Sequence, residues 1–273
     1  MLQPNVKLMP WTDKFVVDNT PTNRSVTLRD PPEGRSTSIS CSQAFQELID
    51  IAIEADVFKT LHFQHSEAFP ILGAKYSVDV ERFAGDLFGI AARGAHMTMY
   101  TLTSAGMKIW VPRRNANMFT YPNKLDTTVA GGVAADETPL QNIIREAQEE
   151  ASLPKDLIVK NIRATGVLTY MSYFAGTPGG KEPYICPDIV YVYDLEVGPE
   201  VTPVPEDGEV KEFYLMSADE IQEALKQGEF KTNSAVVMLD FFVRHGIITS
   251  DNEKDYVEIV QRMHRRLPFP TTP

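Results

Sequence analysis

The sequence predicts an α+β protein, because segments typical of strands and segments typical of helices alternate along the chain without an internal repeat. Two runs rich in β-branched and aromatic residues, VKNIRATGVLTYMSYF and DIVYVYDLEV, predict strands. Two other segments, TPLQNIIREAQEEA and SADEIQEALKQ, open with Thr or Ser and carry Gln or Glu three residues later, which is the capping-box start of a helix. Both kinds of element therefore belong to one fold.

The composition is that of an ordinary globular protein with an excess of acidic groups. The 273 residues include 43% hydrophobic and 23% charged ones, and the formal net charge is −11. Binding to a phosphate backbone requires an excess of Lys and Arg, so we expect no nucleic-acid partner, whereas bound cations are favoured. The N-terminal stretch lacks the apolar core of a signal peptide, and no stretch approaches about 18 consecutive apolar residues. We therefore expect a cytoplasmic protein without a membrane span.

The cysteines and two of the histidines give no sign of a metal site. Cys41 and Cys186 are far apart and belong to no CxxC or Cys/His cluster, so neither a zinc site nor a disulfide framework is predicted. His62 and His65 have no acidic partner that the pattern identifies, and no metal role is expected for them.

Residues 1–93 are predicted to form a small α+β domain of unclear role. From Asp18 to Ser40 the chain is polar and rich in breakers, which predicts turns and loop. Apolar residues at helical spacing predict a helix from Ser42 to Phe58, with the Ser42 side chain as its cap. The segment Val78 to Arg93 predicts another helix or a passage from helix to strand.

Residues 94–245 are predicted to form the main domain, followed by a helical extension over residues 246–273. The stretch AHMTMYTLT alternates, and a turn at Ser104 to Gly106 leads into a second strand that ends at Pro112. A Gly/Pro loop, AGTPGGKEP, separates the two long strands, and KEFYLMS predicts a shorter one. The last helix of the domain runs from Asn233 to His245 and stops at the following glycine.

The best-defined helix spans Pro139 to Ala151. Thr138 precedes a proline at the first helical position, Gln141 completes the capping box, and Pro154 lies beyond the end. At about 100° per residue, five apolar residues share one stripe that is predicted to face the core. They are Leu140, Ile143, Ile144, Ala147 and Ala151.

The same helix carries three glutamates beside its apolar stripe. Glu146, Glu149 and Glu150 are spaced by three and four residues and form one acidic patch. Grouped carboxylates of this kind are the ligands that Mg²⁺ or Mn²⁺ prefers. Arg145 lies four residues before Glu149 and is placed to pair with it. The alternative from spacing alone is a solvated acidic face.

A longer pattern decides between these alternatives. Gly131, five residues, Glu137, seven residues and then REAQEE resembles the signature of the Nudix hydrolases, G-x5-E-x7-R-E-U-x-E-E-x-G-U, in which U is apolar. Ser152 replaces the last glycine of that signature. The resemblance covers roughly Gly94 to Gln227 and implies an α/β/α sandwich around a mixed sheet.

The Nudix resemblance also implies roles for individual residues. Members of this family bind a divalent metal and catalyse the attack of water on a diphosphate linked to another group. By position, Arg145 would orient Glu149, and Glu137 would brace the loop. The metal ligands would be Glu146, Glu149, Glu150 and the Gly131 carbonyl, with Mg²⁺ or Mn²⁺ as the cofactor. The general base would be a box glutamate or one from a later loop, for which Glu209 is the candidate.

A narrower resemblance points to a substrate. WVPRRNANMFTYPNKLDTTVAGG and the segments after the box look like fungal and plant Nudix proteins related to thiamine pyrophosphokinase, which carry an extra N-terminal domain. This implies a small-molecule substrate of the thiamine diphosphate type, including its oxidised analogues. Arg113 and Arg114 would clamp the diphosphate and Tyr121 would stack on a ring. The chain departs from these relatives at Met118, where they tend to have Lys, and at Asn123, where they tend to have Gly.

Three other functions are considered beside this one. Pyrophosphatase action on an ADP-sugar or coenzyme A stays open, because substrate choice resides outside the box. An isopentenyl-diphosphate isomerase would need a cysteine soon after the glycine pair, and GGVAADE has none. A non-catalytic module would normally have lost box glutamates, which are all kept here. The sequence leaves open whether the N-terminal domain gates the site, supports a homodimer or completes the substrate pocket.

Overall fold

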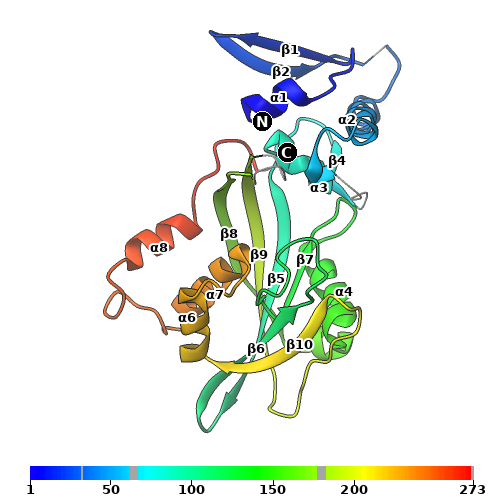
Figure 1. Cartoon of the computed structure of the whole chain (residues 1–273). Coiled ribbons are helices and arrows are strands. Elements are labelled where there is room, and N and C mark those ends of the chain that lie inside the picture. Colours follow the sequence, from blue (N-terminus) through cyan, green and yellow to red (C-terminus); the bar gives the residue numbers. More distant parts are fainter. Residues whose placement is uncertain (32, 62–66, 177–182, 272–273) are drawn as a thin grey trace. The chain divides into compact units, whose positions relative to one another are not determined.

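The computed structural model describes residues 1–31, 33–61, 67–176 and 183–271 (Figure 1). His62, His65 and most of the predicted AGTPGGKEP loop lie outside the described residues. The chain divides into two compact units. The first comprises Met1–Ala92, Met171–Asp188 and Leu267–Pro273, and the second comprises Arg93–Tyr170 and Ile189–Arg266. No helix among the described residues is long and apolar enough to cross a membrane.

The N-terminal unit is built from short elements around an aromatic core. In chain order they are α1 (Gln3–Leu8), β1 (Phe15–Thr20), β2 (Asn23–Leu28), α2 (Thr37–Glu54), the short 3-10 helix Lys59–Leu61, β3 (Ala68–Pro70), β4 (Asp79–Glu81) and α3 (Arg82–Phe88). Two small antiparallel sheets, β1–β2 and β3–β4, lie in this unit. Its core is formed by α2 and α3 residues such as Leu48, Ile49 and Leu87, which are fully buried.

The second unit contains the helices that cover the large sheet and most of the sheet itself, whose two longest strands also contribute residues to the first unit. Its elements are β5 (Ala92–Thr103), β6 (Gly106–Arg114), β7 (Val129–Gly132), α4 (Pro139–Ala151), α5 (Lys155–Asn161), β8 (Ile162–Phe174), β9 (Tyr184–Glu196), β10 (Val210–Ser217), α6 (Ala218–Lys226), α7 (Thr232–Arg244) and α8 (Tyr256–Met263). The strand order is β10-β6-β5-β9-β8, and β7 also pairs with β5. The β6, β7 and β10 pairings are antiparallel, whereas β5 and β9 run in the same direction, so the sheet is mixed (Figure 1).

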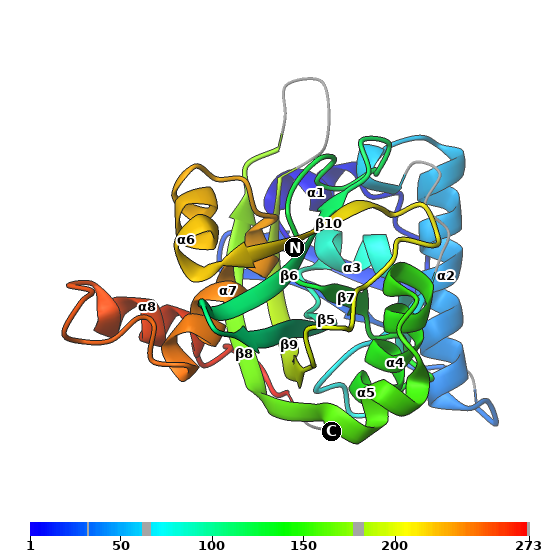
Figure 2. The ribbon, with the colours of Figure 1, turned by 90° about the horizontal axis from the view of Figure 1, so that it is seen from below.

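Helices cover both faces of this sheet because alternate residues of its strands point to opposite sides. Met97 and Met99 of β5 pack with Ile143 and Ala147 of α4 in one core. The next residue of β5, Tyr100, packs on the other side with α7. Figure 2 shows α4 and α5 on one side of the strands and α6 and α7 on the other. The predicted α+β class and the sandwich with a mixed sheet are confirmed.

Two predictions for the N-terminal unit are wrong. The stretch from Asp18 to Ser40, predicted as loop, contains most of a hairpin in which β1 and β2 pair from Phe15 with Leu28 to Thr20 with Asn23. Polar side chains fill most of its exposed positions, so the hydrophobic alternation is weak. α2 begins at Thr37, and the Ser42 hydroxyl does not cap it but accepts a hydrogen bond from the Asp79 amide at 3.0 Å.

Three details of the main domain also differ from the prediction. β6 continues past Pro112 to Arg114, because it pairs with β10 as far as Arg114 opposite Val210. Leu140 is 41% exposed and lies at the solvent edge of the apolar stripe rather than in the core. The first residues of VKNIRATGVLTYMSYF belong to α5, since the strand β8 begins only at Ile162.

Candidate active site

The acidic helix α4 is fixed at both ends by side-chain hydrogen bonds. Its N-terminal capping box is formed as predicted: the Thr138 hydroxyl accepts from the Gln141 amide, and the Gln141 side chain accepts from the Thr138 amide at 2.8 Å. At its other end Ser152 adopts a left-handed conformation with φ 51°. The Ser152 hydroxyl contacts the Val204 carbonyl at 3.0 Å and the Glu206 carboxylate at 2.7 Å. The end of α4 is thereby tied to the loop before β10.

Gly131 brings the backbone of β7 against the first box glutamate. β7 pairs with β5, with Gly131 opposite Ala95. A Cβ added at Gly131 would overlap the carboxylate of Glu146, so only glycine lets the strand and this side chain approach so closely. The first glycine of the sequence pattern, Gly131, therefore has a steric cause.

Arg145 binds three carboxylates at once. Its guanidinium lies 3.2 Å from Glu137, 3.0 Å from Glu146 and 2.9 Å from Glu149. Partial burial by itself would lower the pKa of Arg145, but the hydrogen bond to Glu137 and the charges of Glu146 and Glu137 raise it. Arg145 is therefore a fixed cation that draws loop and helix carboxylates together.

Asn142 is a member of this cluster that the sequence pattern did not identify. It is fully buried in α4, and its amide donates to the Gly132 carbonyl at 2.8 Å and to the Glu137 carboxylate at 2.7 Å. The same amide lies 3.5 Å from Glu146. Its place one residue before Ile143, at the edge of the predicted apolar stripe, was the available sequence signal, and it does not reveal that Asn142 itself is buried.

Two of the box glutamates are held where a negative charge is unfavourable without a cation. Burial, with the charges of Glu149 and Glu209 and against the opposing charge of Arg145, raises the pKa of Glu146 to about 7. Burial also raises the pKa of Glu150 well above its usual range, together with the charge of Glu146. Glu150 accepts one hydrogen bond, from the Ala130 amide at 3.2 Å. The charge of the exposed Glu209 contributes to the raised pKa of both Glu146 and Glu150.

This donor set fits a hard divalent cation. Carboxylate and carbonyl oxygens are the ligands that Mg²⁺ prefers, and a bound cation relieves the repulsion that raises both pKa values. Among the described residues, no three acidic, His or Cys side chains converge as a ready-made metal site. Arg145 contacts Oε1 of Glu146 and Oε2 of Glu149, so the second oxygen of each carboxylate can still face a cation.

The candidate substrate residues lie on the β6 end and the loop that follows. Arg113 is bonded to the Asn123 carbonyl at 2.8 Å and to Glu229 at 3.2 Å, and it lies over the Tyr214 ring. Tyr121 is 44% exposed. Asn123 has φ 59°, so the turn that a glycine would favour is formed here by asparagine, which tolerates this conformation. The clamping and stacking roles of these residues stay predictions.

Arg114 belongs to a buried polar cluster with Asp126. The two side chains lie 3.2 Å apart, and Lys231 at the start of α7 approaches the same carboxylate at 3.3 Å. The Ser234 hydroxyl also donates to Asp126. Burial opposes the charge of Asp126, but Lys231 and Arg114 lower its pKa to about 2. The cluster joins the end of β6 to α7, and the sequence pattern did not predict Lys231 or Asp126 as its members.

Comparison with known proteins finds similar sequences in yeast and plants. An uncharacterized protein of Saccharomyces cerevisiae is 44% identical over 199 residues, which are 70% of this chain and 58% of that protein. Nudix hydrolase 20, chloroplastic, of Arabidopsis thaliana is 27% identical over 236 residues, which are 86% of this chain and 59% of that protein. The chain thus spans less than two thirds of the length of these relatives.

The chain also matches solved structures and a family model. A crystal structure from Deinococcus radiodurans matches with 19% identity and a TM-score of 0.36, over 64% of this chain and 83% of that one. The family model described as NUDIX domain matches residues 93–236, the part of the chain that contains β5, the glycine pair, the acidic helix and the start of α7. With this match over more than half of its length, and with the box residues assembled around Arg145, the chain belongs to the Nudix family.

Proposed function

We propose that the protein hydrolyses a diphosphate linked to an organic group in the presence of Mg²⁺ or Mn²⁺, and that its substrate is thiamine diphosphate or an oxidised analogue. The products are then the monophosphate and phosphate. The observation that carries the proposal is the assembly of Glu137, Glu146 and Glu149 around Arg145 beside the Gly131 backbone. Family membership supports the reaction class, and the narrower sequence resemblance supports the substrate.

Each residue of the site has a defined part in this proposal. Glu146, Glu149, Glu150 and the Gly131 carbonyl hold the cation, which when bound neutralises diphosphate charge and acidifies a water molecule. Arg145 and Asn142 keep the loop and helix carboxylates in place. Glu149 or Glu209 accepts the proton of the attacking water, because both are exposed carboxylates of the cluster.

The substrate proposal places the organic group near the loop after β6. The exposed ring of Tyr121 offers a stacking surface for a cationic heterocycle. Arg113 contacts Asn123 in the loop after β6 and Glu229 between α6 and α7, and it would direct its remaining donors to phosphate oxygens. The same proposal places the enzyme in the cytoplasm and allows it to act as a homodimer.

Product analysis over a panel of diphosphates tests this proposal. The purified protein with Mg²⁺ is incubated separately with thiamine diphosphate, its oxo analogue, ADP-ribose and coenzyme A, and the products are identified by mass spectrometry. We expect thiamine monophosphate, or its oxo counterpart, as the main product at the highest kcat/KM. Preferred cleavage of ADP-ribose or coenzyme A would keep the reaction class and overturn the substrate. Cleavage of none of these compounds would overturn both.

A further inference from the structure

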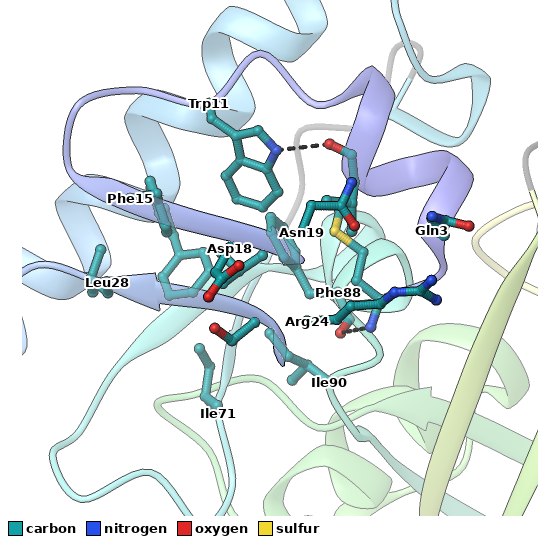
Figure 3. A pocket seen from close by; sticks show the side chains of 15 residues that line it. Gln3, Trp11, Phe15, Asp18, Asn19, Arg24, Leu28, Ile71, Phe88 and Ile90 are labelled. Carbon is teal, nitrogen blue, oxygen red and sulfur yellow. Dashed lines mark hydrogen bonds between the residues drawn. The ribbon is translucent and has the colours of Figure 1, made fainter. Parts of the chain in front are cut away.

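A cavity of about 550 Å³ lies within the N-terminal unit (Figure 3). Its lining comes from α1, the β1–β2 hairpin, α2 and the segment that ends α3, and all of these residues belong to Met1–Ala92. Its volume falls within the range of small-molecule sites, roughly 300 to 1,000 Å³. None of the residues proposed for hydrolysis lines it.

The inner wall of this cavity is aromatic. Trp11 packs on Phe15 with ring centroids 5.4 Å apart and on Phe88 at 6.4 Å, and Phe45 lies 5.6 Å from Phe15 and 5.3 Å from Phe88. The Trp11 indole N–H already donates to the Val6 carbonyl at 2.8 Å, so the indole offers the cavity only apolar surface. A wall of packed rings suits a flat apolar body.

Two cations line the cavity: the Met1 ammonium donates to the Phe88 carbonyl at 3.1 Å, whereas the donors of Arg24 have no partner among the described residues. Arg24 stands opposite Asn19 in the hairpin register, and both side chains line the cavity (Figure 3). Asp18 also lines it, but its two carboxylate oxygens already accept from the Thr20 amide at 2.9 Å and the Asn23 side chain at 3.0 Å. The rim is thus able to donate to an anion through Arg24 while the acceptors of Asp18 are used within the hairpin.

We propose that this cavity binds a small amphiphilic molecule with a flat apolar body and a single anionic group, the body lying against Trp11 and Phe88 and the anion at Arg24. A carboxylate, sulfonate or phosphate fits the guanidinium donors equally well. The ligand is a small molecule rather than a protein segment, because the cavity has the volume of a small-molecule site and combines an aromatic wall with the guanidinium of Arg24. The site is independent of the proposed hydrolysis.

Two fluorescent probes that differ in charge test the proposal on the full chain. 1-Anilinonaphthalene-8-sulfonate has an aromatic body and one anionic group, whereas N-phenyl-1-naphthylamine has the same body without the charge. We expect both to bind wild-type protein with one site each. Arg24→Gln should weaken the sulfonate about three- to tenfold and leave the neutral probe unchanged. Asp18→Asn, which removes a nearby like charge, should tighten the sulfonate only.

Two further variants keep the test decisive. Arg29→Gln is the matched control, because Arg29 directly follows β2 but does not line the cavity. Its guanidinium donates to the Asp13 carbonyl at 2.8 Å. This substitution should change neither affinity. Val26→Trp fills the cavity from an exposed strand position without a charge change and should abolish binding of both probes. Thermal melting of each variant verifies that it is folded.

The proposal is overturned by any of three results. One is equal affinity of the sulfonate for wild type and a folded Arg24→Gln. Another is undiminished binding of both probes to a folded Val26→Trp, which would place them elsewhere. The third is the absence of saturable binding of either probe to the wild-type chain.

Discussion

Ser152 combines an unfavourable backbone conformation with two useful side-chain contacts. Its φ of 51° lies in the left-handed region, which costs a non-glycine residue roughly 1 to 2 kcal/mol. Its hydroxyl contacts Val204 and Glu206. A glycine at this position would avoid the strain but would lose the tie to the next loop.

A pair of substitutions separates these two effects. Ser152→Ala and Ser152→Gly both lose the hydroxyl, but only alanine keeps the strained left-handed backbone. We therefore expect the free energy of unfolding of Ser152→Ala to be about 1 kcal/mol lower than that of Ser152→Gly. Urea denaturation of both variants measures the difference. Equal stabilities would mean that the backbone at this position relaxes when the hydroxyl contacts are removed.

His96 is a buried base whose titration should appear in the acid stability of the protein. Burial and the charge of Lys231 lower its pKa to about 3, and its Nδ1 lies 2.7 Å from the Thr127 hydroxyl. In the unfolded chain its pKa is about 6.5. Below that value the unfolded chain binds a proton that the folded protein does not, so stability falls as the pH falls.

The His96→Gln variant tests this pH dependence. From pH 7.5 to pH 5 the wild type should lose about 2 kcal/mol more unfolding free energy than the variant, which has no such proton to bind. Both proteins are unfolded with urea at the two pH values without metal. A difference between them that stays constant with pH would show that His96 titrates in the folded protein as it does in the unfolded chain.

Asn142 should position the metal ligands rather than merely fill the helix interior. Asn142→Asp has the same shape but turns the donor to Glu137 into a second carboxylate. We expect the Mg²⁺ concentration for half-maximal rate to rise about 10- to 100-fold. Asn161→Asp is the matched control, because the Asn161 amide donates only to the Leu157 carbonyl at 2.9 Å, within its own helix α5. A variant with unchanged Mg²⁺ dependence and reduced melting temperature would leave Asn142 a structural residue.

The capping box decides where helix α4 begins and so where the box carboxylates lie. Thr138→Ala removes the acceptor of the Gln141 amide and should lower the unfolding free energy by about 1 kcal/mol. Ser217→Ala removes the equivalent cap of α6 and should cost a similar amount. Only the first substitution is expected to reduce hydrolysis. Equal losses of activity would argue against a specific role of the α4 start.

Helices with strong end signals were predicted well, and segments with weak patterns were not. α4, α6 and α7 agree with the prediction to within one or two residues, because caps and breakers are local. The β1–β2 hairpin was missed because most of its side chains are polar and exposed. Leu140 was misplaced because an apolar stripe does not reveal where the neighbouring layer ends. Such boundaries depend on tertiary packing.

The candidate site was predictable as a set of residues but not as a set of contacts. The spacing of Glu146, Glu149 and Glu150 places them on one helix side, and Arg145 was expected to pair with Glu149, as it does. That Arg145 also binds Glu137 and Glu146 depends on how the loop folds back on α4. Lys231 approaches Asp126 from a distant part of the chain, and such a contact leaves no local pattern.

The two compact units of the chain divide its proposed functions between them. The second unit contains the box and its surrounding carboxylates, and the first contains the cavity lined by Trp11 and Arg24. Strands β8 and β9 contribute residues to both. The hydrolysis proposal and the cavity proposal therefore rest on separate residues, and either can fail without the other.

The most direct measurement compares Mg²⁺-dependent cleavage of the diphosphate bond by three proteins: the wild type, Glu149→Gln and the exposed helix control Glu223→Gln. The substrates are thiamine diphosphate, ADP-ribose and coenzyme A, and ³¹P NMR follows the bond in each. We predict cleavage of at least one substrate by the wild type and the control, loss of activity in EDTA, and a kcat lower by about a hundredfold or more in Glu149→Gln. Equal rates for wild type and Glu149→Gln, or no cleavage of any substrate by the wild type, would contradict a hydrolytic role for the box.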